Sequence, residues 1–194
     1  MAPTDSLNTR DRILDEAERL LHVKGLKGTS VSELVDAAEV QKGTLYHYFS
    51  GKQEVALRVI ERAGDRFITF IQSSMQGGDP MEQLYAFIEA ARQKKEDQSF
   101  VGGCLFGNTA LEASDTNPEL SAAVEQVFDR WAKLLGPVIE EGQKKGQIRA
   151  DMPADDLAYH VIAVLEGGIM QSRLRKDATI FNSNVECLKR FLAQ

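Results

Sequence analysis

The sequence predicts an all-α protein in which an N-terminal three-helix head, containing a helix-turn-helix, precedes a C-terminal helical body. Apolar residues recur at intervals of three and four along the chain, and no segment alternates with period two over a useful length. Two short helical patterns lie only a few residues apart between residues 29 and 52, which is helix-turn-helix spacing. At 194 residues the chain can form one large domain or two small ones. We place the boundary after residue 52, which gives a head of residues 1–52 and a body of residues 53–194.

The first helix of the pair is predicted by a stripe of apolar residues. They fall at positions i, i+3, i+4 and i+7 and therefore share one helix face: Val31, Leu34, Val35 and Ala38. Thr29 or Ser30 can cap the start of this helix, because a side-chain oxygen at that position accepts a hydrogen bond from a free main-chain N–H. The sequence thus predicts a short, capped helix beginning near residue 30.

The second helix of the pair is anchored by Leu45 and Phe49, which are four residues apart. Its remaining face offers hydrogen-bond donors and acceptors, a positive charge and flat rings: Gln41, Lys42, Thr44, Tyr46, His47 and Tyr48. Phosphates, base edges and thymine methyl groups require such groups of a helix in a major groove. The same geometry also serves as a plain packing device with a solvated polar face, so the pattern alone leaves both interpretations open.

The body is expected to consist of further helices separated by glycine and proline. The Gly-Gly-Asp-Pro run at residues 77–80 ends the first of them, and Asn117 with Pro118 suits the cap and first turn of a later one. The helices are expected at residues 51–76, 81–96, 104–114, 117–145, 153–173 and 179–193.

The helix expected at residues 153–173 is apolar on nearly every side between residues 157 and 170. That is more apolar surface than the core of one chain usually needs, so we expect a second chain to cover part of it. Gly167 and Gly168 would each cost a helix about 1 kcal/mol relative to Ala, which is tolerable where another helix approaches closely. The alternative is that the last two helices only close the core of a monomer.

Composition limits the classes of function. The formal net charge is -6, and residues 1–55 carry seven Lys or Arg against nine Asp or Glu, so DNA binding would depend on where the charges lie. The chain has no apolar run long enough for a bilayer and no leader signal, which favours a cytoplasmic protein without a membrane partner. Cys104 and Cys187 are far apart in the sequence, so the cysteines indicate neither a disulfide framework nor a zinc site. The sequence has three His, no H-E-x-x-H motif and no phosphate-binding loop, so we expect no catalytic residue, no metal and no cofactor. We therefore expect no enzyme.

Three runs in the first quarter of the chain carry a family resemblance. They are TRDRILDEAERLL at residues 9–21, KGLKGTSVSELVDAAEV at 24–40 and KGTLYHYFSGKQEV at 42–55. Together they resemble the DNA-binding domain of the TetR family of bacterial transcriptional repressors. The chain departs from the family pattern at Glu39, where Gly is usual in the turn, and at Gln41, where Ser is frequent.

The resemblance implies a ligand-responsive repressor that binds a pseudopalindromic operator in double-stranded DNA and is released from it by a small-molecule effector. It also implies a homodimer in which the last two helices of each chain form the interface. The DNA contacts that it implies are Thr29, Ser30, Gln41, Lys42, Gly43, Thr44, Tyr46, His47, Tyr48 and Lys52. The candidates to line an effector cavity are Phe67, Phe70, Tyr85, Cys104, Phe106, Asn108, Trp131 and Met170. Aromatic residues at helical spacing are more often plain core.

Two alternatives stay open. Cys104 follows two glycines at an expected helix start, where the helix dipole favours a thiolate, so an electrophile- or redox-sensing repressor of the same fold is the first. Against it, cysteines are often simply buried, as we expect for Cys187. The second is a helical adaptor that binds no DNA, which would leave the combination of Lys42, Tyr46 and His47 around an anchored short helix unexplained.

Overall fold

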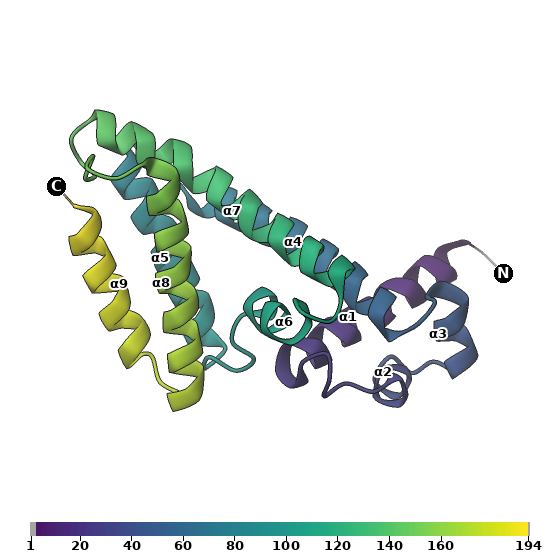
Figure 1. Ribbon diagram of the computed structural model, residues 1–194. Coiled ribbons are helices and arrows are strands. Elements are labelled where there is room, and N and C mark those ends of the chain that lie inside the picture. The colour runs from purple at the N-terminus through teal and green to yellow at the C-terminus, as the bar shows by residue number, and fades with distance from the viewer. Residues whose placement is uncertain (1–2, 194) are drawn as a thin grey trace. The chain divides into compact units, whose positions relative to one another are not determined.

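The computed structural model describes residues 3–193, with side chains from residue 9 onward. In this part of the chain nine α-helices follow one another (Figure 1), which confirms the predicted all-α class. They are α1 (Pro3–Lys24), α2 (Val31–Ala37), α3 (Lys42–Tyr48), α4 (Lys52–Ser74), α5 (Pro80–Asp97), α6 (Leu105–Ala113), α7 (Pro118–Lys144), α8 (Ala154–Arg175) and α9 (Thr179–Leu192).

Contacts divide the chain into two compact units that alternate along the sequence. The first unit runs to Asp65 and includes Leu105–Glu125, and the second unit comprises Arg66–Cys104 and the chain from Gln126 onward. Helix α6 therefore belongs to the same unit as α1, α2 and α3, although the sequence placed it in the body. The predicted division after residue 52 stays a prediction about domains, and the contacts give a different grouping of the helices.

The helix-turn-helix in the first unit forms as the apolar pattern predicts. Leu34, Ala38 and Leu45 are at most 1% exposed, and Val35 and Phe49 are buried with them. Burying side chains of this size contributes about 1.5–3 kcal/mol each, which is ample to hold helices of seven residues that would not be stable in isolation. The apolar stripe thus fixes α2 and α3 in place and leaves the opposite face of α3 to solvent.

The turn after α2 uses a left-handed residue at the departure from the family pattern. Glu39 has φ of +52°, an uncommon value for a residue with a side chain. Its N–H donates to the Asp36 carbonyl at 3.2 Å, and the Val40 N–H donates to the Val35 carbonyl at 2.9 Å. These two bonds form a Schellman motif, which satisfies the last carbonyls of α2. The turn position at which the family usually has Gly therefore takes left-handed backbone angles in this chain as well.

The second unit has its own apolar core, to which α8 and α9 contribute side by side (Figure 1). Six of the apolar residues expected to give α8 its excess surface are buried within the chain: Leu157, Ala158, Val161, Ile162, Leu165 and Ile169. The two helices approach closely at Gly168, where an added Cβ would lie 3.0 Å from the Phe181 ring of α9. Most of the apolar circumference of α8 therefore serves the core of its own unit.

None of the described helices combines the length and the apolar character that crossing a membrane requires. Among the same residues, no group of three His, Cys, Asp or Glu side chains is arranged to hold a metal ion.

Candidate nucleic-acid interface

Helix α3 exposes the polar face that the sequence predicted. Gln41, Lys42, Gly43, Tyr46 and His47 are exposed, and Thr44 and Tyr48 are half-buried beside the buried anchors. The Lys42 ammonium lies 5.9 Å from the centre of the Tyr46 ring, one helical turn away, so the two side chains are close together on this face. No side chain caps the start of α3, which leaves the Gln41 side chain and the first N–H groups of the helix available to an external acceptor.

The start of α2 is fixed by a capping box between Ser30 and Glu33. The Glu33 N–H donates to Ser30 Oγ at 3.2 Å, and the Ser30 N–H donates to Glu33 Oε2 at 2.8 Å. Lys24 Nζ reaches the other oxygen of Glu33 at 2.5 Å. Hydrogen bonds from Lys24 and Ser30 lower the pKa of Glu33 to about 2. The carboxylate therefore stays ionised at any ordinary pH, and Ser30, a predicted DNA contact, is exposed on a fixed backbone.

Two predicted DNA contacts also have roles within the chain. Thr29 is 1% exposed, and its hydroxyl donates to the Gly25 carbonyl at 2.8 Å, so its side chain belongs to the interior, and its predicted contact with DNA stays a prediction. Lys52 Nζ donates to the carbonyls of Leu26 and Thr29 at 2.8 and 2.7 Å. Lys52 thus ties α4 to the loop between α1 and α2, and its predicted phosphate contact stays a prediction beside this role.

The eight candidate effector residues do not form one cluster within a single unit. Phe106 and Asn108 lie on α6 in the first unit, and the others lie in the second unit. Met170 is 60% exposed, whereas Tyr85 is half-buried against the core and donates its hydroxyl to the Lys189 carbonyl at 3.3 Å. The predicted lining set includes residues of both units and stays a prediction.

Trp131 is the candidate with the clearest sign of a missing partner. It is 3% exposed, its ring packs edge-on against Phe67 at 4.9 Å and against Phe87 at 5.9 Å, and it stacks on Phe128. Its Nε1–H is buried, and no described residue accepts it. An unmet buried donor is costly, so this indole is suited to a ligand or water that brings an acceptor.

Cys104 precedes α6 as predicted and has two charged neighbours that the sequence did not reveal. Its thiol is in hydrogen-bonding reach of Glu166 on α8, and burial raises the pKa of Glu166. Lys95 Nζ donates to the Gly103 carbonyl at 2.7 Å, and burial lowers the pKa of that ammonium. These neighbours come from helices α5 and α8, so no local pattern could have indicated them. The sensing role of Cys104 stays a prediction.

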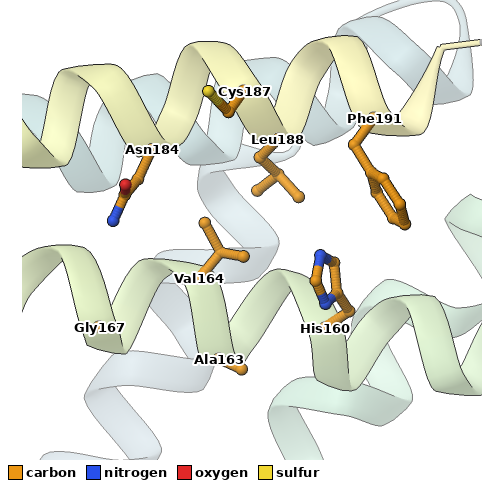
Figure 2. Close-up of a pocket in the computed structure, with 8 residues that line it drawn as sticks. All are labelled: His160, Ala163, Val164, Gly167, Asn184, Cys187, Leu188 and Phe191. Atoms are coloured by element: carbon orange, nitrogen blue, oxygen red, sulfur yellow. The ribbon is translucent and has the colours of Figure 1, made fainter.

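A surface groove of about 510 Å³ lies between α8 and α9. Figure 2 shows its two walls, and its lining residues are His160, Ala163, Val164 and Gly167 from α8 and Asn184, Cys187, Leu188 and Phe191 from α9. Cys187, which we expected to be packed, is exposed on one wall, so that expectation was wrong. The groove is open beside Gly167, where an added Cβ would meet no atom within 4 Å.

Comparisons with known proteins find family matches for both the helix-turn-helix region and the later helices of the chain. The family description "Bacterial regulatory proteins, tetR family" matches residues 13–59, and "Tetracyclin repressor-like, C-terminal domain" matches residues 80–187. The chain belongs to the TetR family. The second match covers more than half of the chain and includes the groove between α8 and α9, so the resemblance carried by the first quarter of the sequence extends through the body.

Individual relatives agree with this family assignment. The transcriptional regulator AcuR of Cereibacter sphaeroides is 30% identical over 89% of this chain and 80% of its own length. The HTH-type transcriptional repressor DhaR of Mycobacterium sp. is 26% identical over 87% of this chain and 84% of its own. A TetR regulator from Chloroflexus aurantiacus superimposes with a TM-score of 0.88 at 31% identity, covering 97% of this chain and 96% of that one. This TetR-family chain is a DNA-binding transcriptional regulator.

Proposed function

We propose that the chain is a repressor that binds a pseudopalindromic operator as a homodimer and leaves it when a small-molecule effector binds in the second unit. The observation that carries this proposal is the exposed polar face of α3, held by buried anchors behind a capped α2, in a member of the TetR family. In helix-turn-helix proteins the second helix enters the major groove, and two of them in a dimer read half-sites one helical turn or its multiples apart.

On α3, Lys42 and the free N–H groups of the first turn are assigned to phosphates, and Tyr46 and His47 to bases or sugars. Gly43 supports a close approach of DNA, because a Cβ at this position would meet no atom of the chain within 4 Å. Packing therefore does not require a glycine there, although glycine weakens a helix by about 1 kcal/mol relative to Ala. A phosphate that contacts the main chain at residue 43 would account for the presence of glycine there.

The partner surface is assigned to α8 and α9, with a second copy of the chain in the groove of Figure 2. Residues of α8 that the core does not bury continue the groove at intervals of four, three and four, as in the seam of a coiled coil: exposed Ala163, half-buried Gly167, and exposed Met170 and Leu174. Met170 and Leu174 are 60% and 84% exposed in the single chain, which is unfavourable for two large apolar side chains unless a partner covers them. Met170 is thus reassigned from the effector site to the interface.

The effector is assigned to the aromatic cluster around Trp131, where Phe67 and Phe70 are half-buried and the indole N–H lacks an acceptor. Such a site suits an apolar molecule that carries one hydrogen-bond acceptor. Because Trp131 is the one tryptophan of the sequence, its fluorescence reports on this cluster alone. An effector that releases DNA without changing the emission of Trp131 would argue against this location.

The test of operator binding is to incubate the purified full chain with fragmented genomic DNA and to sequence the fragments that it retains. We expect fragments that share a pseudopalindrome. Lys42→Ala and Tyr46→Ala should each lose this enrichment while the dimer and the helical content stay as in the wild type. Failure to retain any common sequence, or full retention by both variants, would contradict the assignment of α3.

Gly43→Ala provides the sharpest variant, because its effects on stability and on DNA binding should have opposite signs. Ala should raise the stability of α3 by up to about 1 kcal/mol and yet weaken operator binding, since the Cβ would hold the phosphate away. Gly51→Ala is the matched control, because a Cβ at residue 51 also meets no atom within 4 Å but lies outside α3.

A further inference from the structure

The loop between α1 and α2 is held by a side chain from far along the sequence. Glu112 of α6 accepts a hydrogen bond from the main-chain N–H of Lys27, with 2.9 Å between Oε2 and the nitrogen. The two residues are 85 positions apart, and both belong to the first unit. Glu112 is half-buried and Lys27 is exposed, so the bond lies near the surface.

The glycine at residue 25 shows how closely the carboxylate fits this loop. Gly25 has φ of +75°, and a Cβ built on it would lie 1.9 Å from Glu112 Oε1. The carboxylate therefore occupies the space that a Cβ at residue 25 would fill, and it would have to move if one were added. The backbone conformation itself favours glycine here.

Three carbonyl bonds hold the loop as well. The Thr29 hydroxyl donates to the Gly25 carbonyl, and Lys52 donates to the carbonyls of Leu26 and Thr29. The hydrogen bond from the Lys27 N–H to Glu112 adds a main-chain donor to this set, and we call these four bonds the loop clamp. The next residue after this clamp is Ser30, which begins α2. The direction in which α2 leaves the loop is therefore set by α4 and α6 as well as by α1.

We propose that Glu112 is a positioning residue for operator binding, which holds the loop between α1 and α2 so that the start of α2 and the face of α3 meet DNA together. This inference rests on the proposed function, because operator affinity is the property that Glu112 controls. Its carboxylate cannot act by touching DNA, since a negative charge repels phosphates. Helix α6 follows Cys104 directly, where the second unit gives way to the first, so the clamp lies one short helix away from that residue in sequence.

The sign of the expected effect separates positioning from simple electrostatics. Removing one negative charge from a chain of net charge -6 should raise its affinity for DNA or leave it unchanged. Loss of the hydrogen bond between the Lys27 N–H and Glu112 should instead lower operator affinity by about three- to tenfold. This change in binding free energy is smaller than the contribution of one charge-assisted hydrogen bond. A fall in affinity after removal of an acidic residue is thus specific to the proposal.

The experiment uses the full chain and the DNA fragment that the wild type retains, with affinity measured by fluorescence anisotropy at a fixed salt concentration. Glu112→Ala should weaken binding as stated, and Glu112→Asp should weaken it too, because its carboxylate is shorter by one methylene although the charge is kept. Glu112→Gln should bind within about twofold of the wild type, since its amide oxygen can accept the same hydrogen bond. Glu125→Ala, on an exposed position of α7 in the same unit, is the charge-matched control.

Hydrogen exchange at the Lys27 amide provides a second readout that a general loss of stability would not change selectively. It should become faster than in the wild type for Glu112→Ala and Glu112→Asp, and should be unchanged for Glu112→Gln and Glu125→Ala. Wild-type affinity in both weakened variants, or a loss of affinity with the Lys27 amide still protected, would overturn the proposal. If the wild type retains no DNA fragment, it is the proposed repressor function that fails. Should Glu112→Ala not fold, Glu112→Asp decides the question.

Discussion

Substitution of Glu39 by glycine tests whether the turn of the helix-turn-helix is strained. Glu39 follows the end of α2 with φ of +52° and closes a Schellman motif with the Asp36 carbonyl. Left-handed angles cost a residue with a Cβ roughly 1–2 kcal/mol, and glycine adopts them without this cost. Glycine also gains freedom in the unfolded chain, which offsets about 0.4–1 kcal/mol. We therefore expect Glu39→Gly to raise the free energy of unfolding by roughly 0.5–1 kcal/mol.

Urea unfolding followed by circular dichroism should show a higher midpoint with an unchanged slope, and the melting temperature should rise by about 1–4 °C for a chain of this size. Glu39→Ala is the matched control, because it removes the same side chain and keeps the Cβ. It should be no more stable than the wild type. If both variants are equally stabilised, the charge of Glu39 is responsible and not its backbone. A clearly less stable glycine variant would mean that the Glu39 side chain contributes a contact that outweighs the strain.

Three further predictions concern the second unit. Gly167→Arg should give folded monomers that lose operator binding, because a Cβ at residue 167 meets no atom of its own chain within 4 Å and the rest of the Arg side chain would occupy the groove. Sedimentation should show dimers for the control Gln126→Arg at an exposed position of α7, and a dimeric Gly167→Arg would contradict the interface. Labelling of Cys187 by maleimide should slow as rising protein concentration forms dimers, whereas labelling of half-buried Cys104 should not depend on concentration. Burial raises the pKa of Glu166 above its usual 4.5, so the contribution of Glu166 to stability is full below pH 4.5 and is lost as the pH rises through the raised pKa. The free energy of unfolding of Glu166→Gln, relative to that of the wild type, should therefore increase between these two pH values. A difference in stability that does not vary with pH would refute this prediction.

The sequence predicted best what depends on local pattern. The apolar stripe of α2 and the anchors of α3 follow from the spacing of apolar residues alone. A cap at Thr29 or Ser30 follows from their hydroxyl groups, and the structure places it at Ser30. Glu39 belongs to this group, because a non-glycine residue at a tight turn is visible in the sequence. These features fixed the position of the candidate DNA-binding face before any contact was known.

The roles that sequence reasoning missed depend on contacts between distant segments. Lys52 looked like a phosphate contact because it is a basic residue after α3, but it binds carbonyls 26 and 23 residues away. Nothing in the residues around Glu112 indicates its partner, the Lys27 N–H, which is 85 residues away. Leu165 and Gly167 lie two residues apart on one apolar helix, and periodicity alone could not indicate that the first faces its own core and the second an open groove.

The acidic composition of the first unit agrees with DNA binding once the partners of its carboxylates are known. Many of them are bound within the chain: Glu16 to Arg19, Asp15 and Glu18 to Arg62, Glu33 to Lys24 and Ser30, Glu54 to Ser50 and Arg58, and Glu112 to Lys27. Lys42 and Tyr46 remain exposed on α3. Glu39 is the exposed carboxylate at the turn directly before that helix, so it should repel phosphates more than the carboxylates paired within the chain. Glu39→Gly and Glu39→Ala should consequently both bind operator more tightly than the wild type, with a difference that shrinks as salt is added, although only the glycine variant should be more stable.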